Sequence, residues 1–236
     1  MLSAHNLTKT YKGTTILENI DLEVPDGDFV ILTGRSGSGK TTLLSILGGL
    51  TSPDSGTVVL DDEDIFKMGE KALASLRNRK MGFVFQFPSL VPTLKTLDNV
   101  LLPIAFSGRT PDIDDLDRAK ELLEMVGMGE HMNHYPSQLS GGQQRRAVLA
   151  RSLINKPKVL LADEPTGDLD EKSEAVIMEL FARFNEQGVT VFINTHALDY
   201  ISLGKQVITL KEGRIVPYEA QEVASGLGPS GWAEHK

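Results

Sequence analysis

The sequence predicts an α/β fold with a mainly parallel sheet, an N-terminal antiparallel β region and a helical insertion. Three observations support this prediction. Short apolar runs alternate with helical segments, which is typical of a parallel sheet. A glycine-rich turn directly follows one of these runs. A mostly helical stretch over about 87–157 separates the earlier strands from the later ones.

Composition limits the possible classes of protein. The chain has 236 residues, enough for one large domain or a domain with a sub-domain. It carries 24 Lys and Arg against 32 Asp and Glu, a net charge of −8. This acidic balance argues against nucleic-acid binding and direct adhesion to anionic lipid. It has no cysteine, which excludes disulfides, thiolate zinc sites and cysteine nucleophiles.

Two β-like runs open the chain, and a buried strand, a helix and two further strands follow them. The opening runs flank Lys12 and Gly13 and predict the antiparallel region. The helix begins near Gly39 and is stopped by Gly48 and Gly49. The expected strands cover Leu2–Thr10, Ile16–Val24, Asp28–Thr33, Val58–Leu60 and Met81–Phe85.

The helical insertion and the second group of strands follow. Gly, Pro and Asp clusters punctuate the insertion. Its expected helices cover Leu97–Ile104, Asp115–Val126 and Gly142–Ile154. Later strands are expected over Val159–Ala162, Val189–Ile193 and Gln206–Leu210, with a helix over Glu171–Gln187. Residues 217–236 are rich in Gly, Pro and Ser and are expected to form a tail.

The segment Gly34–Thr41 reads GRSGSGKT and fits the phosphate-loop pattern G-x-x-x-x-G-K-[ST]. Glycines let successive backbone N–H groups point into one concavity, and the following helix adds its N-terminal dipole. Lys40 can reach the β- and γ-phosphates, and the Thr41 hydroxyl can ligate Mg²⁺. The alternative is a glycine-rich turn without a ligand. The dinucleotide pattern G-x-G-x-x-G fails, because its third glycine would fall on Thr42. The chain also lacks a guanine-reading Asn-Lys-x-Asp motif, which disfavours a GTPase.

Two further motifs carry chemistry. The run VLLADE ends a buried strand in Asp163, which can hold the Mg²⁺ hydration shell, and Glu164, which can polarise an attacking water. Alone, the pair could be a solvated strand end. The run LSGGQ gives Ser140 as a helix N-cap with Gly141 and Gly142 behind it. It is either a well-capped helix or a second anion site, used when one nucleotide lies between two subunits.

With these motifs in this order, residues 2–216 resemble the ATP-binding subunit of ABC transporters, a P-loop NTPase. GRSGSGKT resembles Walker A, LSGGQ the signature and VLLADE Walker B. Tyr11 stands where the family has a base-stacking aromatic. Gln86 resembles the Q-loop glutamine, Gly167–Asp170 the D-loop and His196 the switch histidine. Read alone, Tyr11, Gln86 and His196 could instead be a strand aromatic, a solvated strand end and a core-edge histidine.

The resemblance implies ATP and Mg²⁺ as cofactors. It implies Glu164, His196 and Lys40 as catalytic residues, and Thr41, Gln86 and Asp163 as residues at the metal. The ATP-binding set it implies is Tyr11, Gly34, Arg35, Ser36, Gly37, Ser38, Gly39, Lys40, Thr41, Thr42, Gln86, Ser140, Gly141, Gly142, Gln143, Asp163 and Asp170. Arg35 departs from the more common proline, which should matter little because backbone groups bind the phosphates.

The resemblance also implies partners. The motifs look most like the branch of lipoprotein-release, macrolide-export and cell-division ATPases. We therefore expect an ATP-bound homodimer that powers integral membrane permease subunits by mechanotransmission, in efflux or extraction. The alternative is an ATPase whose membrane complex regulates an extracytoplasmic enzyme. A soluble ATPase of DNA repair or translation is disfavoured, because the chain has one motif set and no long coiled-coil insertion.

The sequence has no apolar run of spanning length and no N-terminal secretory signal. We therefore expect a cytoplasmic protein, held at the cytoplasmic face of the inner (plasma) membrane through its partner, without inserting itself. The partner is expected to grip a groove after Gln86, with Phe87, Leu90, Leu101 and Leu102 as candidate contacts. Ordinary packing of the insertion is the alternative for those four side chains. The 1–216 ATPase domain would thus contain a mobile helical sub-domain.

Overall fold

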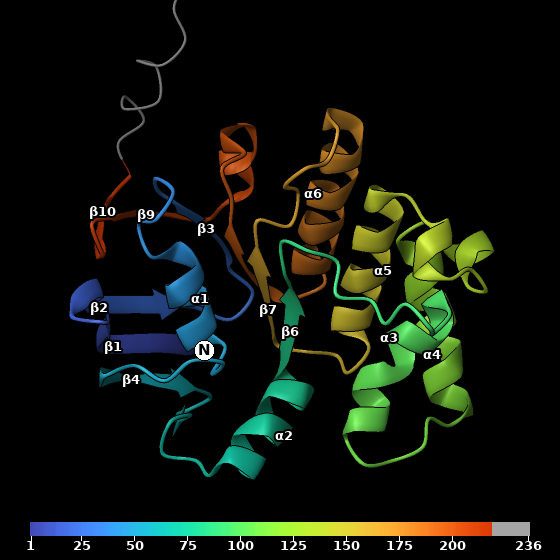
Figure 1. Ribbon diagram of the computed structural model, residues 1–236, viewed down its shortest axis with the longest axis horizontal. Helices are drawn as coiled ribbons and strands as arrows, with labels where there is room; N and C mark the ends of the chain where they lie inside the picture. The colour runs from blue at the N-terminus through green and yellow to red at the C-terminus, as the bar shows by residue number, and fades with distance from the viewer. Residues whose placement is uncertain (219–236) are drawn as a thin grey trace, which may run out of the picture.

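Two β-sheets organise the chain, and helix α1 packs between them (Figure 1). The computed structural model describes residues 1–218. The smaller sheet has four antiparallel strands in the order β2-β1-β4-β5. Its strands are β1 (Leu2–Tyr11), β2 (Thr14–Val24), β4 (Ser55–Leu60) and β5 (Glu63–Asp64). This is the antiparallel N-terminal region that the sequence predicts.

The larger sheet has six strands in the order β10-β9-β3-β8-β7-β6. Five of them run parallel, and β10 pairs antiparallel with β9 at one edge. The predicted α/β fold with a mainly parallel sheet is confirmed. The strands are β3 (Phe29–Thr33), β6 (Met81–Val84), β7 (Val159–Asp163), β8 (Thr190–Asn194), β9 (Gln206–Lys211) and β10 (Arg214–Pro217).

The helices lie on both faces of the parallel sheet. In Figure 1, α1 and the antiparallel sheet lie on one side, and α5 and α6 lie on the other, with α3 and α4 outside α5. The α-helices are α1 (Lys40–Leu47), α2 (Glu70–Lys80), α3 (Thr96–Phe106), α4 (Ile113–Met125), α5 (Gly141–Leu153) and α6 (Glu171–Glu186). Short 3₁₀ turns are η1 (Gly129–His131), η2 (Pro136–Gln138) and η3 (Leu198–Leu203).

Alternation along the strands divides the core into two halves. Phe29 and Ile31 of β3 point to the core shared with α5 and α6, whereas Val30 and Leu32 point to the core shared with α1 and the antiparallel sheet. Because both faces are covered, the strand is an uninterrupted apolar run. The parallel pairing brings the carboxyl ends of β3, β7 and β8 to one edge, the usual ligand edge of such sheets.

Helix α2 is the main element that the sequence did not predict. Only Leu76 of this helix is buried, and charged side chains surround it, so it has no apolar stripe to recognise. Strands β5 and β10 were also not predicted, and most predicted boundaries differ from the structure by one to three residues. The strand expected to end at Phe85 ends at Val84, and β10 extends to Pro217, into the expected tail. The rest of that tail, 219–236, lies outside the described residues.

Candidate nucleotide site

The loop between β3 and α1 can form only with glycine at two positions. Gly34 has φ +145°, and a Cβ there would collide with the carbonyl oxygen of Leu210. Gly39 is the N-cap of α1 at φ +104°, with the carbonyl oxygen of Ile16 only 2.9 Å from where a Cβ would stand. Neither position tolerates a side chain. The first turn of α1 also has no side-chain cap and no acidic residue, which leaves its N–H groups open to an anion.

Lys40 spans the mouth of this loop. Its side chain is buried, and Nζ donates hydrogen bonds to the carbonyl oxygens of Gly34 at 2.8 Å and Arg35 at 3.1 Å. Burial lowers the pKa of Lys40, and the carboxylates of Glu164 and Asp163 oppose that shift. The loop therefore holds a cation close to the open N–H groups of α1, which is the chemistry a phosphate group requires.

One buried polar atom in the loop fits this interpretation. Ser38 Oγ has no hydrogen-bond partner within residues 1–218. An unpaired buried hydroxyl costs free energy unless a ligand satisfies it. A phosphate oxygen in the loop would supply that partner, so the residues present fit a nucleotide phosphate.

The ends of β7 and β8 bring the acidic pair to the same place. Asp163 is buried, and its Oδ1 accepts hydrogen bonds from Thr41 Oγ1 at 3.2 Å and from the Asn194 side-chain amide. Glu164 is the next residue and adopts a positive φ of 44°. His196 Nε2 lies 3.1 Å from Glu164 Oε1 and 3.4 Å from Lys40 Nζ. Three separate segments of the sequence thus meet within contact distance.

Asn194 is a site residue that the motif analysis missed. It is fully buried at the end of β8, and its side-chain amide donates to Asp163. Its Oδ1 has no hydrogen-bond partner among the described residues. The signal was present in the sequence: an asparagine ends the apolar run TVFIN, two residues before His196. Polar side chains at that end of a parallel strand point toward the ligand edge.

Gln86 and the D-loop lie together beside the acidic pair. Gln86 follows β6, and a Cβ on Gly167 would lie 3.8 Å from Gln86 Cγ and 3.4 Å from the Glu164 carbonyl oxygen. Asp170 is the N-cap of α6 and accepts from Ser173 N at 3.1 Å and from Ser173 Oγ at 2.8 Å. These bonds to Ser173 lower the pKa of Asp170. The structure thus gives Asp170 a capping role of its own.

Tyr11 ends β1 and pairs with Thr14 across the turn into β2. Its ring is 46% exposed, and Lys9 Nζ lies 5.2 Å from the ring centroid. Since Ile16 of β2 abuts Gly39 of the loop, the antiparallel sheet brings this exposed ring to the loop's neighbourhood. Arg35, Ser36 and Gly37 lie between β3 and α1, and Thr42 lies in the first turn of α1, as the motif requires.

The signature segment is not part of this cluster. Ser140 caps α5, accepting from Gln143 N at 3.3 Å, while Gln143 Oε1 accepts from Ser140 N at 2.8 Å. Helix α5 packs on the sheet face opposite α1 (Figure 1). Ser140 and Gly141 are exposed to solvent.

Gln143 also has a histidine contact that the sequence did not suggest. Its Nε2 lies 3.1 Å from His131 Nε2, and the Nδ1 atoms of His131 and His134 are 2.9 Å apart. Both histidines are half-buried. The segment before the signature therefore contacts it through His131 and Gln143.

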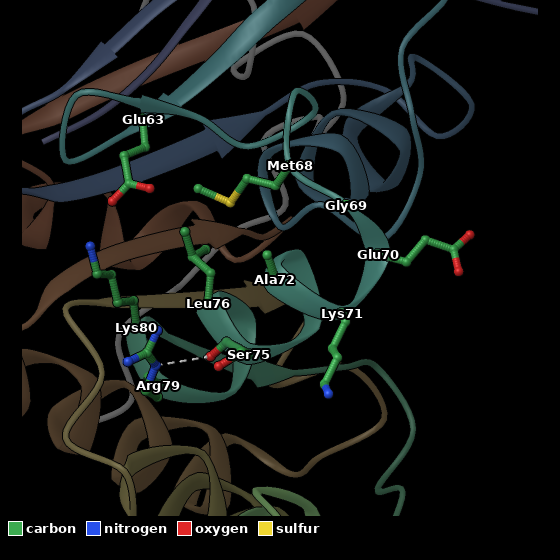
Figure 2. Close-up of a pocket in the computed structure, with 10 residues that line it drawn as sticks. All are labelled: Glu63, Met68, Gly69, Glu70, Lys71, Ala72, Ser75, Leu76, Arg79 and Lys80. Carbon is green, nitrogen blue, oxygen red and sulfur yellow. Dashed lines mark hydrogen bonds between the residues drawn. The ribbon is translucent and has the colours of Figure 1, made fainter.

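Two concavities border α2. The first, of about 730 Å³, contains none of the loop or strand-end residues. Figure 2 shows Met68 and Leu76 turned toward this space, with Glu63 and Lys80 to one side. The second, of about 310 Å³, we call the α2–α5 groove. It is lined by Leu50, Ala74, Arg77, Asn78, Met81, Gly82, Phe83, Phe85, Pro103, Arg151, Ser152, Ile154 and Asn155.

Comparison with known proteins decides the family. The family model described as ABC transporter matches residues 17–167. The chain belongs to this family. An uncharacterised ABC transporter ATP-binding protein of Thermotoga maritima is 47% identical, with 89% of each chain covered. The lipoprotein-releasing system ATP-binding protein LolD of Aquifex aeolicus is 42% identical, with 92% of this chain and 96% of that one covered.

Two other comparisons extend this result. The macrolide export ATP-binding/permease protein MacB of Syntrophobacter fumaroxidans is 42% identical to this chain. The match covers 92% of this chain but only 31% of that longer protein. The cassette MJ0796, solved as a dimer bound to ADP and Pi after hydrolysis, has a TM-score of 0.85 at 40% identity, with 93% of this chain and 98% of that chain covered. This chain is an ABC-type ATPase subunit, and both the family and the fold expected from its motifs are confirmed.

Among the described residues, no three His, Asp or Glu side chains gather into a metal-binding group. Across residues 1–218, no helix combines the length and apolar character needed to cross a membrane.

Proposed function

We propose that two copies of this chain hydrolyse ATP at shared sites and thereby drive an integral membrane partner. Each ATP would lie between Gly34–Thr42 of one copy and Ser140–Gln143 of the other. The observation that carries this proposal is the position of the two helix starts on opposite faces of one sheet. The dimeric cassette MJ0796, similar over nearly its whole length, supports it.

The cluster at the loop supports the chemical roles. Lys40 and the N–H groups of α1 would neutralise charge on the phosphates, which is the main task in phosphoryl transfer. Glu164 would orient the attacking water, and its 3.1 Å contact with His196 supports their acting together. We infer further that Tyr11 stacks on adenine, and that Asp170 communicates across the dimer.

The residues present also fit Mg²⁺. Thr41, Asp163 and Gln86 offer the hydroxyl, carboxylate and amide oxygens that this ion prefers. When bound, the ion would supply positive charge that offsets the negative charge developing on the phosphates. Asn194 would keep the Asp163 carboxylate oriented, because its amide already donates to Oδ1.

The α2–α5 groove is the surface we assign to the membrane partner. It borders the segment before Gln86, so a partner seated there would move with the nucleotide site. Apolar side chains are exposed at and beside it: Phe85 at 38%, Leu50 at 43% and Phe87 at 70%. Such an exposed apolar rim marks an interaction site. Leu90 is buried instead, and Leu101 packs against the core, so these two belong to the packing of the insertion.

We infer that the partner complex performs efflux or extraction. The relatives named for lipoprotein release and macrolide export support this assignment. The partner would hold the chain at the cytoplasmic face of the inner (plasma) membrane. Within the 1–216 ATPase core, the helices between about 87 and 157 would then move as an inserted sub-domain.

The test uses the full chain in its native host. Glu164→Gln should leave ATP binding intact, cut turnover by about 10²–10⁴-fold and trap an ATP-dependent dimer. Glu179→Gln, on the exposed face of α6, is the matched control and should turn over normally. Turnover of Glu164→Gln within a few-fold of the wild type would remove Glu164 from its catalytic role.

The partner is tested with the same trapped protein. Tagged Glu164→Gln, extracted from membranes with ATP present, should co-purify with a stoichiometric integral membrane protein. Adding Leu50→Asp, at an exposed residue that lines the groove, should remove that protein, whereas adding Ile113→Asp should not, because Ile113 is 66% exposed on α4, outside the groove residues. Recovery of soluble partners or ribosomes alone would overturn the membrane assignment. A partner that binds normally without any transport would favour regulation of an extracytoplasmic enzyme.

A further inference from the structure

Arg145 lies on the second turn of the signature helix α5, but its guanidinium reaches back into the protein. The side chain is 4% exposed. Burial lowers the pKa of Arg145, with Asp168 opposing the shift, yet an arginine stays charged at any physiological pH. A buried charge is costly, so the contacts that it makes deserve a functional explanation.

The guanidinium joins two loops of the nucleotide site. Nη1 donates to the carbonyl oxygen of Phe85 at 3.1 Å, and Nη2 donates to the carbonyl oxygen of Gly167 at 2.9 Å. Phe85 is the residue before Gln86. Gly167 closes a turn on Glu164, donating its N–H to the Glu164 carbonyl oxygen at 3.1 Å. One rigid fork thus pins the backbone beside both candidate site residues.

The two pinned loops also touch each other. A Cβ on Gly167 would lie within 3.9 Å of Gln86 Cγ and Nε2. A shift of the backbone at Gln86 would therefore displace the backbone at Gly167, and the reverse. Helix α5 packs directly against β6 and α6. A shift of α5 would therefore move the Arg145 guanidinium and, through it, both loops.

We propose that Arg145 is a positioning residue for hydrolysis: it fixes Gln86 and Glu164 relative to the signature helix of the same chain. This rests on the proposed function, in which Gln86 and Glu164 act on ATP. In the dimer, the start of α5 would contact the ATP held by the other copy. A change in how α5 contacts that ATP would then shift Arg145, and with it Glu164 of the same copy.

The neighbouring arginine provides a matched control. Arg146 is also partly buried, and burial also lowers its pKa. Its Nη1 donates to the carbonyl oxygens of Val126 and Gly127, at 3.0 Å and 3.1 Å. Those carbonyls end α4, on the outer side of α5, and neither belongs to the nucleotide site. Loss of a buried arginine contact can thus be compared at two adjacent positions.

The test compares Arg145→Lys with Arg146→Lys in the full-length chain with its membrane partner. Lysine keeps the charge, but a single ammonium cannot fork to both carbonyl oxygens. Arg145→Lys should lower kcat by about 10–100-fold with KM for ATP changed less than about threefold, because a small misplacement of reacting groups is costly. Arg146→Lys should keep kcat within about threefold even if it lowers Tm equally.

Amide hydrogen exchange gives a readout that does not depend on activity. Exchange in Arg145→Lys should speed up at the segments around Gln86 and Gly167, and in Arg146→Lys around Val126 and Gly127 instead. Equal kcat losses in the two variants, or unchanged exchange at both pinned loops, would overturn the proposal. Glu164→Gln is measured in parallel. If it turns over normally, the proposed function fails, whereas a steep loss there with a normal Arg145→Lys rejects only the positioning role.

Discussion

Helices α1 and α5 both begin at a candidate phosphate site, but they are built differently. Helix α1 begins at Gly39, which has no side chain to satisfy the first N–H groups. Helix α5 begins at Ser140, whose hydroxyl and Gln143 close a reciprocal capping box. Beside α1 stand the Lys40 ammonium and the unpaired Ser38 hydroxyl. The start of α5 has no such ammonium group, and its Ser140 hydroxyl is already paired with Gln143 N.

The two helices share one feature that separates them from the others. Among the α-helices within residues 1–218, only α1 and α5 have no acidic residue in the first turn. Acidic residues there normally stabilise a helix, but they would repel a phosphate. The start of α1 is thus a complete cradle. The start of α5 offers little beyond a helix dipole worth about 0.3–1 kcal/mol, which is too weak to hold a nucleotide alone.

The largest expected effect comes from placing a charge at the start of α5. Ser140→Asp keeps a good N-cap but puts a carboxylate where the other copy's ATP would lie. Like charges in contact cost several kcal/mol, so turnover should fall about 10²–10³-fold. ATP binding by single copies and Tm should stay near wild type. Ser140→Asn, an equally good neutral cap, should retain most activity.

That prediction separates a shared site from an unshared one. Steady-state turnover and ATP affinity of the monomer are measured on the same preparations. Equal losses of monomer binding in Ser140→Asp would show that one chain alone uses both helix starts.

The next effect concerns the start of α1. Lys40→Met should weaken ATP binding by single copies about 10–100-fold, since charged hydrogen bonds contribute about 1.5–3 kcal/mol. Calorimetric titration with ATP in the absence of turnover measures this directly. Lys71→Met, an exposed lysine of α2, is the control. Near-normal affinity in Lys40→Met would mean that backbone groups alone hold the nucleotide.

A stability difference is expected between the glycines of the two motifs. Gly34→Ala forces a Cβ against the Leu210 carbonyl at a φ that disfavours side chains, and should cost about 1–3 kcal/mol. Gly141→Ala meets only Leu169 Cδ2, at 3.8 Å, and should be neutral or slightly stabilising. Urea unfolding of both variants tests the comparison. Equal stabilities would mean that the β3–α1 loop adapts freely.

The smallest expected effect concerns the start of α4, which lies outside both candidate phosphate sites. In α4, Arg109 lowers the pKa of Asp115, part of a capping box with Asp112, to about 2. A carboxylate with a depressed pKa stabilises the fold above its unfolded value of about 3.9. That contribution is lost as the pH falls toward 2.

Asp115→Gln should therefore lower stability by under about 1 kcal/mol at pH 7, because the Arg109 side chain is half-exposed and solvent weakens the pair. The gap to wild type should close between about pH 4 and pH 2, as measured by Tm against pH. The box of α5 has no titrating group, so Gln143→Ala should shift stability by the same amount across that range. A pH-independent gap for Asp115→Gln would contradict the assigned cause.

The motifs predicted most of the candidate site because phosphate chemistry restricts local sequence. Gly34, Lys40, Asp163, Glu164 and His196 were all found from short runs, and the structure brings them together. Helix α2 escaped prediction because it lacks an apolar face. Asn194 and Arg145 escaped because a single polar residue at a strand end or on a helix looks the same whether it touches solvent or a buried carbonyl.

The sequence alone determined the alternation of strands and helices, the loop that only glycine permits, and the carboxylates at the end of an apolar strand. Each depends on neighbours in the chain, through backbone sterics and side-chain periodicity. Tertiary structure alone decided that Ser140 lies across the sheet from Lys40, that Asn194 holds Asp163, and that Arg145 joins Phe85 to Gly167. The hydrogen bonds link residues 22–60 positions apart, so they form only once the layers have packed. The separation of Ser140 from Lys40 likewise depends on that packing.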